Sequence, residues 1–327
     1  MDNITHTLVG LMLSRAGLNR GEKGAPLMLM LAANAPDMDT YPFFTDSLEY
    51  LQVHRGYTHS LLFAPLVALI PLLLVKAFTR TRFTLVTLAT YAGCVLAVLS
   101  HLLLDWTNVY GVRLMLPFSA KWYRLDSTDI IDPVILGVLI LALAAPALSA
   151  LISSEMSGRK SAGPRRGWAW FALIAVLFYD TGRWMAHDRA IDLIDAHNYK
   201  GAPAERISVF PVRFTVMRWR GVVEGDGFIY EVPVDLTRDF DAAGGHTEYP
   251  AISSPAIDAA RTTRTFEVFE KFDQLPFWTL LPVEDTVRVE LIDLRFGSVQ
   301  RPGFEAVAFV EPDHRIARAY FSFGDPR

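Results

Sequence analysis

The sequence predicts a mainly α-helical fold, in which a polytopic helical membrane bundle is followed by a soluble α+β domain. Three observations predict it. Apolar stretches of membrane-span length recur before residue 185, the residues from about 200 onward read as an ordinary soluble domain, and basic residues alternate along the chain with His and Asp residues. A chain of 327 residues has the length of two domains. We expect the bundle to cover residues 1–199 and the α+β domain residues 200–327.

Six apolar segments form the predicted bundle. Residues 61–78, 83–104 and 130–152 approach or reach the length of about 20 residues that a helix needs to cross a bilayer. Residues 167–185 form a fourth, more polar stretch. Residues 5–18 and 26–35 are short for a full span, because a helix rises only about 1.5 Å per residue. We expect these two to form a hairpin of short or partly inserted helices packed against the longer ones.

The distribution of Lys and Arg predicts the orientation of the bundle, since cytoplasmic connections carry an excess of both. Every second connection between the apolar segments contains Lys and Arg, ten residues in total, whereas the remaining connections contain four. The ten are Arg15, Arg20, Lys23, Lys76, Arg80, Arg82, Arg159, Lys160, Arg165 and Arg166. The other side of the membrane then carries the His and Asp residues and the C-terminal domain, which we expect to be extracytoplasmic.

The C-terminal residues show the alternation typical of strands. We expect strands at residues 206–219, 228–236, 277–282, 286–296, 304–311 and 315–323, and one amphipathic helix at residues 254–272. This order predicts an α+β domain with a mainly antiparallel sheet. The formal net charge of −4 gives no basic footprint, so no nucleic-acid partner is predicted.

Imidazole and carboxylate groups, the ligands of divalent metals, recur at one end of successive apolar segments. Ionisable groups in or beside membrane segments are costly and usually serve a function. His101 and Asp105 are spaced i, i+4 and therefore share one helix face. A zinc or manganese ion there, one or two in number, would lower the pKa of a bound water. The candidate metal ligands are His6, Asp37, Asp39, His59, His101 and Asp105.

The candidate catalytic residues are His54 and Arg55, which precede His59 in the same block. Arg55 would bind a phosphate or stabilise a developing negative charge. Each candidate ligand also has a structural explanation: His6 as a helix cap or interfacial residue, Asp37 and Asp39 as helix caps. His101 and Asp105 could pair only with each other. Their recurrence on one side of one bundle favours a metal site.

Four sequence blocks resemble the YdjM-type membrane-bound metal-dependent hydrolases, also described as LexA-binding inner-membrane hydrolases. The blocks are Thr5-His6-Thr7, Ala35-Pro36-Asp37-Met38-Asp39, His54-Arg55-Gly56-Tyr57-Thr58-His59-Ser60 and His101-Leu-Leu-Leu-Asp105. The resemblance covers roughly residues 1–185. It implies a bacterial inner-membrane protein and a hydrolase.

A weaker similarity runs to zinc-dependent phospholipase C and the zinc-dependent single-strand nucleases, which cleave phosphoesters. This similarity implies that Asp37 or Asp39, His59, His101 and Asp105 hold a first ion. His6 and a shared Asp105 would help to hold a second ion. The chain lacks the later His-x-x-x-Glu of those enzymes, so one or two ions are expected rather than three.

Together these observations predict a membrane hydrolase whose metal-activated water attacks a phosphoester or other ester. The substrate would be an amphiphilic lipid or cell-envelope molecule at the extracytoplasmic membrane surface, with the bilayer as the other partner. The alternative is a non-enzymatic membrane protein, whose metal is structural and whose outer domain binds a partner or senses an envelope signal. A transporter is less favoured, because transporter sites usually lie near the bilayer midplane and these residues gather at one end.

Overall fold

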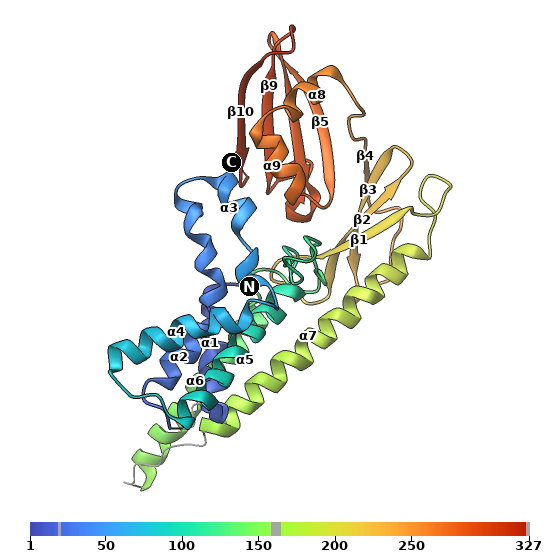
Figure 1. Ribbon diagram of the computed structural model, residues 1–327. Coiled ribbons are helices and arrows are strands. Elements are labelled where there is room, and N and C mark those ends of the chain that lie inside the picture. The colour runs from blue at the N-terminus through green and yellow to red at the C-terminus, as the bar shows by residue number, and fades with distance from the viewer. Residues whose placement is uncertain (19–20, 158–164, 325–327) are drawn as a thin grey trace. The chain divides into compact units, whose positions relative to one another are not determined.

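The computed structural model describes residues 1–18, 21–157 and 165–324 (Figure 1). These residues form two compact units. The first unit contains Met1–Asp39, Arg55–Asp188 and Pro211–Met217, and the second contains Thr40–His54, Arg189–Phe210 and the chain from Arg218 onward. The predicted division of the chain at residues 199 and 200 remains a prediction about domain organisation.

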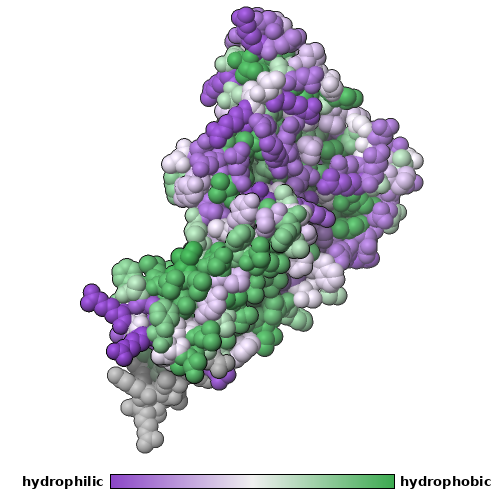
Figure 2. All heavy atoms as spheres, in the orientation of Figure 1, coloured by the Kyte–Doolittle hydropathy of each residue, from purple (hydrophilic) through white to green (hydrophobic). Residues whose placement is uncertain are grey.

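The first unit is helical, as the apolar segments predict. Figure 2 shows apolar side chains over most of the visible face of these helices, whereas polar side chains dominate the strand-rich part. The helices are α1 (Asn3–Leu13), α2 (Ala25–Ala32), α4 (Ala64–Thr79), α5 (Leu85–Thr107), α6 (Pro133–Ser157) and α7 (Arg165–Asp195), of which α7 belongs to this unit up to Asp188, with a π-helical turn η1 at Ser14–Leu18. Arg20, Arg159 and Lys160, three of the basic residues used to predict orientation, lie outside the described residues.

Two helices of the described chain are long and apolar enough to cross a membrane, Leu85–Thr107 and Pro133–Leu151, with mean hydropathies of 1.8 and 2.6. The broken pair Ser47–His59 and Ala64–Thr79 could provide a third crossing. The sequence predicted a fourth span at residues 167–185. This prediction is not confirmed, because α7, which contains these residues, is not among the candidates in the described chain.

Local chemistry explains where the site-bearing helices begin. The Asp2 carboxylate accepts hydrogen bonds from the backbone N–H groups of Ile4 and Thr5, each at 3.0 Å, which satisfies two free donors at the start of α1. Thr84 and Thr87 form a reciprocal capping box at the start of α5. Both helices contribute residues to the cluster described below, so these caps help to fix its walls.

The second unit contains two four-stranded sheets and a small third one. The strands β1 (Arg206–Pro211), β2 (Arg218–Gly225), β3 (Phe228–Asp235) and β4 (His246–Glu248) are neighbours in that order. The other sheet has the order β10 (Ile316–Ser322), β9 (Glu305–Val310), β6 (Thr286–Asp293) and β5 (Pro276–Val283). Strands β7 (Gly297–Ser298) and β8 (Arg301–Pro302) form the third sheet. Pairings β2–β3, β3–β4, β5–β6, β6–β9, β7–β8 and β9–β10 are antiparallel.

Two expectations for this unit were wrong in detail. The expected helix 254–272 is two helices, α8 (Pro255–Arg261) and α9 (Arg264–Phe272). The Thr262 and Thr263 hydroxyls donate to the carbonyls of Ala259 and Ala260 at 2.7 and 2.8 Å, and side-chain bonds of this kind compete with helix continuation. The expected strand 206–219 is also divided, because residues 212–217 form a loop between β1 and β2 that belongs to the first unit.

Helices α1 and α2 pack closely at Gly10. A Cβ atom added to Gly10 would lie 2.6 Å from the carbonyl oxygen of Leu29 and 2.9 Å from the Cβ of Ala33. Both neighbours belong to rigid backbone or short side chains, so neither can move aside cheaply. Small residues permit such close approach between membrane helices.

We expect Gly10→Ala to lower the melting temperature of the detergent-purified protein, because the added methyl group separates α1 from α2. Gly137→Ala is the matched control in α6, where nothing lies within 4 Å of an added Cβ. That control should leave stability unchanged or raise it, since glycine costs about 1 kcal/mol relative to alanine in a helix interior. Equal melting temperatures for both variants would contradict close packing at Gly10.

Candidate metal centre

Four buried side chains from three elements of the first unit meet in one cluster. Asp37 comes from the 3-10 helix η2 (Ala35–Phe44), and His59 ends the 3-10 helix η3 (Tyr57–His59). His101 and Asp105 lie one turn apart near the end of α5. Asp37 is 9% exposed and the other three are fully buried. Each offers a nitrogen or oxygen atom within 4.8 Å of the others, so the group could hold a metal ion.

The spacing of these four donor atoms fits a tetrahedral ion. The Nε2 atoms of His59 and His101 lie 3.2 Å apart. The distances from His59 Nε2 to Asp37 Oδ1 and Asp105 Oδ2 are 3.4 and 3.5 Å, and from His101 Nε2 to the same oxygens 3.5 and 3.4 Å. Ligands at the usual zinc bond lengths of roughly 2.0–2.1 Å lie about 3.3 Å from one another in a tetrahedron. Five of the six distances between pairs of donor atoms therefore match the spacing that an enclosed tetrahedral ion requires.

Hydrogen bonds hold both imidazoles with Nε2 toward the cluster. His101 Nδ1 lies 2.7 Å from the carbonyl oxygen of Ala33, which can only accept, so Nδ1 carries the proton. His59 Nδ1 lies 3.2 Å from Asp39 Oδ2, and the hydroxyl of Thr58 donates to the same Asp39 oxygen at 2.5 Å. Outer partners of this kind fix the ring orientation of metal-binding histidines and raise their basicity.

This arrangement places Asp39 behind His59, outside the group of four that surrounds the central space. The sequence predicted Asp37 and Asp39 as equivalent candidate ligands. The structure distinguishes the two carboxylates by their positions on η2. Asp37 lies beside the Nε2 atoms of both imidazoles, whereas Asp39 lies beside Nδ1 of His59. Direct ligation by Asp39 remains a prediction.

His6 adds a further buried imidazole to the same cluster. It is 1% exposed and stacks on His101 with ring centroids 3.8 Å apart. Its Nε2 lies 3.4 Å from Asp105 Oδ1, and neither ring nitrogen makes a hydrogen bond within the described chain. A buried imidazole without a hydrogen bond is costly, so an ion bound between His6 and Asp105 would remove that cost.

Arg55 faces the ligand carboxylate. Its Nε lies 3.2 Å from Asp105 Oδ2, and its Nη1 donates to Asn108 Oδ1 and to the carbonyl oxygen of Gly111 at 3.1 and 2.9 Å. The guanidinium also lies over the ring of Tyr110, 4.5 Å from its centroid. Arg55 is only 3% exposed, and the Met1 amino group also contacts Asp105. The guanidinium therefore partly balances the charge of Asp105 and fixes its orientation.

Two residues of this surround were not predicted from the sequence. Asn108 contacts Asp105 at 3.4 Å and accepts from Arg55, and Tyr110 carries the guanidinium on its ring face. Asn108 follows Asp105 by three residues, a spacing that indicates contact on a helix face. Nothing in the spacing of Tyr110 indicates its role, because it lies beyond the end of α5.

His54, the other predicted catalytic residue, belongs to the second unit. It ends helix α3 (Ser47–Val53), and its ring stacks on Tyr50 with centroids 4.7 Å apart. The side chain is 5% exposed. A catalytic role for His54 or Arg55 remains a prediction.

The environment of Asp37 favours its ionised form. Burial alone would raise the pKa of this carboxyl group, but the charge of His101 and hydrogen bonds from His101 and His59 outweigh burial and lower the pKa below its usual range. These interactions favour the carboxylate form of Asp37, the form in which it can bind a cation.

We expect Asp39→Asn to weaken metal binding by about 10- to 100-fold, because the amide is a poorer acceptor for the Nδ1–H group of His59. The measurement is competition with a chromogenic chelator on the purified protein. Asp285→Asn, in the exposed turn between β5 and β6, is the matched control and should bind as the wild type does. An unchanged affinity in Asp39→Asn would show that Asp39 does not orient His59.

Comparisons with known proteins identify the family of the chain. The model of the family described as "YdjM inner membrane protein" matches residues 1–190, a range that includes every residue of the cluster. A Bacillus subtilis (strain 168) protein described as "Uncharacterized protein YfhP" is 26% identical over 333 residues, which cover 98% of this chain and 94% of that protein. No solved structure matches. With more than half of its length matched by the family model, the chain belongs to the YdjM family of inner membrane proteins.

Proposed function

We propose that this protein is a membrane-bound metal-dependent hydrolase, and His6 is the observation that carries the proposal. A structural zinc site is usually complete with four protein ligands, whereas a catalytic site keeps a position open for water or substrate. Asp37, His59, His101 and Asp105 already supply four. A purely structural site has no need of another buried imidazole beside Asp105 that makes no hydrogen bond in the described chain.

The excess of donors supports a centre with more coordination positions than one tetrahedral zinc ion offers. Two arrangements fit: two ions that share Asp105, or one ion of higher coordination number, such as manganese, that leaves positions open. Such a metal, when bound, supplies hydroxide near neutral pH by lowering the pKa of a bound water. Zinc is the first choice for a two-ion site, because imidazole and carboxylate are both common zinc ligands.

The protein's own residues have distinct roles in this proposal. Asp39 and the Ala33 carbonyl hold the two imidazoles in the tautomer that presents Nε2. Arg55 acts as a positioning residue through Asp105, since its guanidinium is already engaged by Asp105, Asn108 and Gly111. The burial of the cluster excludes bulk water and strengthens every charge interaction within it.

The position of the cluster in the chain suggests the substrate class. His101 and Asp105 lie in the last two turns of Leu85–Thr107, a candidate membrane span, so the site lies close to one membrane boundary. A site at that depth suits an amphiphilic phosphoester or other ester, such as a lipid or a lipid-linked envelope molecule. The bias of basic residues supports an extracytoplasmic site, with the C-terminal domain on the same side.

A structural metal is the second candidate function. It is favoured by the completeness of the four-donor set and by the burial of His59, His101 and Asp105, none of which is accessible to solvent. In that case the ion would join η2, η3 and α5, and the outer domain would carry the function by binding a partner or sensing a signal. His6 would then be dispensable for metal binding.

We expect the wild-type protein to contain at least one stoichiometric divalent ion and His59→Ala to lose it, because only three of the four donors would remain. Mass spectrometry of metal in detergent-purified protein measures this directly. His197→Ala, which replaces an exposed imidazole beyond the end of α7, is the control and should keep the ion. A wild-type protein that takes up no metal, even when it is added, would remove the basis of both candidate functions.

We expect His6→Ala to retain a tightly bound ion in the four-donor group but to lose hydrolysis of a chromogenic phosphodiester or carboxylic ester by at least about tenfold, the lower range for lost metal-site support. If a second ion is bound, the metal content should also fall by one. A His6→Ala protein with normal hydrolysis would exclude the catalytic role of His6. A wild type that binds metal but hydrolyses neither ester would favour the structural role.

A further inference from the structure

A short apolar loop of the first unit has no role in the metal centre. It consists of residues 212–217, between β1 and β2, and is called here the 212–217 loop. Its flanking strands belong to the second unit, yet the loop itself groups with the helices. Four of its six side chains are large, apolar and exposed: Val212 39%, Phe214 72%, Val216 39% and Met217 46%.

Hydrogen bonds attach this loop to the helical unit. Arg183 of α7 is 2% exposed, donates from Nε to the carbonyl oxygen of Ser127 at 2.9 Å, and donates from Nη1 to the carbonyl oxygen of Val216. Arg213 forms an ion pair with Asp129 at 3.3 Å. The loop is therefore held on α7 and on the segment that leads into α6.

The largest apolar side chain of the loop is exposed, and its backbone conformation is unusual. Phe214 has a φ of +59°, a left-handed conformation that bulky residues rarely adopt. The turn is closed by Thr215, whose backbone N–H and hydroxyl both donate to the carbonyl oxygen of Val212, at 3.2 and 2.8 Å. A fixed turn that presents a phenylalanine to its surroundings needs an apolar environment to cover that side chain.

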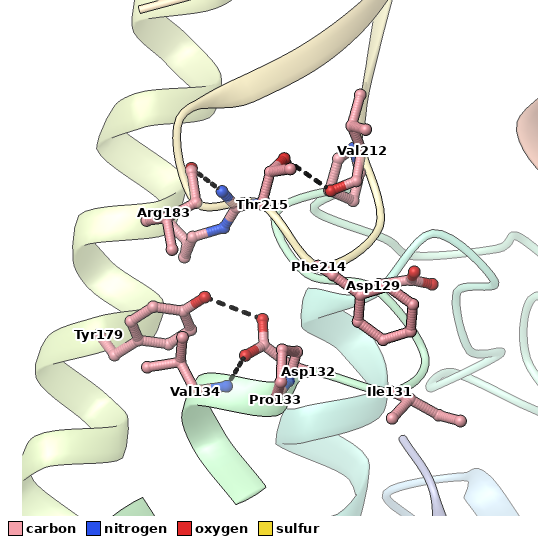
Figure 3. Close-up of a pocket in the computed structure, with 12 residues that line it drawn as sticks. Asp129, Ile131, Asp132, Pro133, Val134, Tyr179, Arg183, Val212, Phe214 and Thr215 are labelled. Atoms are coloured by element: carbon pink, nitrogen blue, oxygen red, sulfur yellow. Dashed lines mark hydrogen bonds between the residues drawn. The ribbon is translucent and has the colours of Figure 1, made fainter. Parts of the chain in front are cut away.

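The neighbours of the loop place it at a membrane boundary. Phe214 and Ile131 line the same small pocket of about 30 Å³, together with Tyr179 and Asp132 (Figure 3). Ile131 is 51% exposed and lies two residues before Pro133–Leu151, the most apolar candidate span, of which only 22% is buried within the protein. Asp132 caps the start of that helix through the N–H groups of Val134 and Ile135. The loop therefore lies where the span enters the bilayer.

We propose that the 212–217 loop inserts Phe214 and its apolar neighbours into the interfacial region of the bilayer, at the membrane face where α6 begins. Its partner is the lipid surface. Aromatic side chains are favoured at this depth. The adjacent Arg213, which is 76% exposed, has the charge to contact lipid phosphate groups at the same level. The exposed apolar side chains on the candidate spans also need lipid, because they would otherwise contact water. The 212–217 loop extends that apolar surface beyond the helices.

The test uses a fluorophore attached to one introduced cysteine in the full-length protein. Cys94, the single native cysteine, is buried and is replaced by alanine in every variant. Phe214→Cys is labelled with an environment-sensitive fluorophore, and the protein is reconstituted in vesicles of phosphatidylcholine and phosphatidylglycerol. Ile140→Cys, on an exposed face within the α6 span, is the lipid control, and Asp285→Cys, in the exposed β5–β6 turn, is the aqueous control.

We expect the label at position 214 to lose fluorescence in vesicles of brominated lipid, as the Ile140→Cys label does, and to be protected from aqueous iodide. Quenching by iodide without quenching by brominated lipid, as for Asp285→Cys, would overturn the proposal. Protection from both quenchers would also overturn it, because protein would then cover the loop. Met217→Cys provides a second labelling position, so that the test does not depend on one variant.

Discussion

The ionised carboxylate of Asp105 is the constraint on which the helical unit depends. It is fully buried, and an isolated buried charge would be prohibitively costly. Arg55 lies beside one oxygen and the Met1 amino group contacts the other, and these two cationic groups offset this cost, while the Nε2 atoms of His59 and His101 lie 3.5 and 3.4 Å from Oδ2. These partners come from the segment before α1, from the segment between α3 and α4, and from α5. The carboxylate is therefore surrounded only when these separate segments have come together.

The same arrangement relates stability to function. Four donors at tetrahedral spacing would hold one ion firmly, and such a site stabilises the fold that brings the donors together. The extra imidazole of His6 lies beside the shared carboxylate, where it adds little to a site that is already complete. Its burial therefore needs a functional explanation, and chemistry at the ion provides one. The outer partners Asp39 and Arg55 act on the geometry of the donors in either case.

Much of the helical unit could be predicted from the sequence, because its signals are local. The lengths of the apolar stretches predicted α4, α5 and α6 to within a few residues. The i, i+4 spacing of His101 and Asp105 predicted that they share one helix face. The fourth span remains a prediction, since Asp180 and Arg183 lower the apolar character of α7. In the second unit, the split of the helix at Thr262 and Thr263 was missed because helical periodicity continues across the break. The return of residues 212–217 to the helical unit depends on Arg183, far away in the sequence, and could not be predicted.

The sequence by itself determined the membrane character, the order of the helices and the set of His and Asp residues from which a site is built. These follow from composition and spacing, which do not depend on distant contacts. The tertiary structure alone decided how that set divides, with Asp37 in the group of four, Asp39 behind His59, and Arg55 turned toward Asp105. The physical reason is that residues with the same chemistry become distinct only when the fold fixes their distances. Spacing along the chain can give a residue its helix face, but not its partner across the bundle.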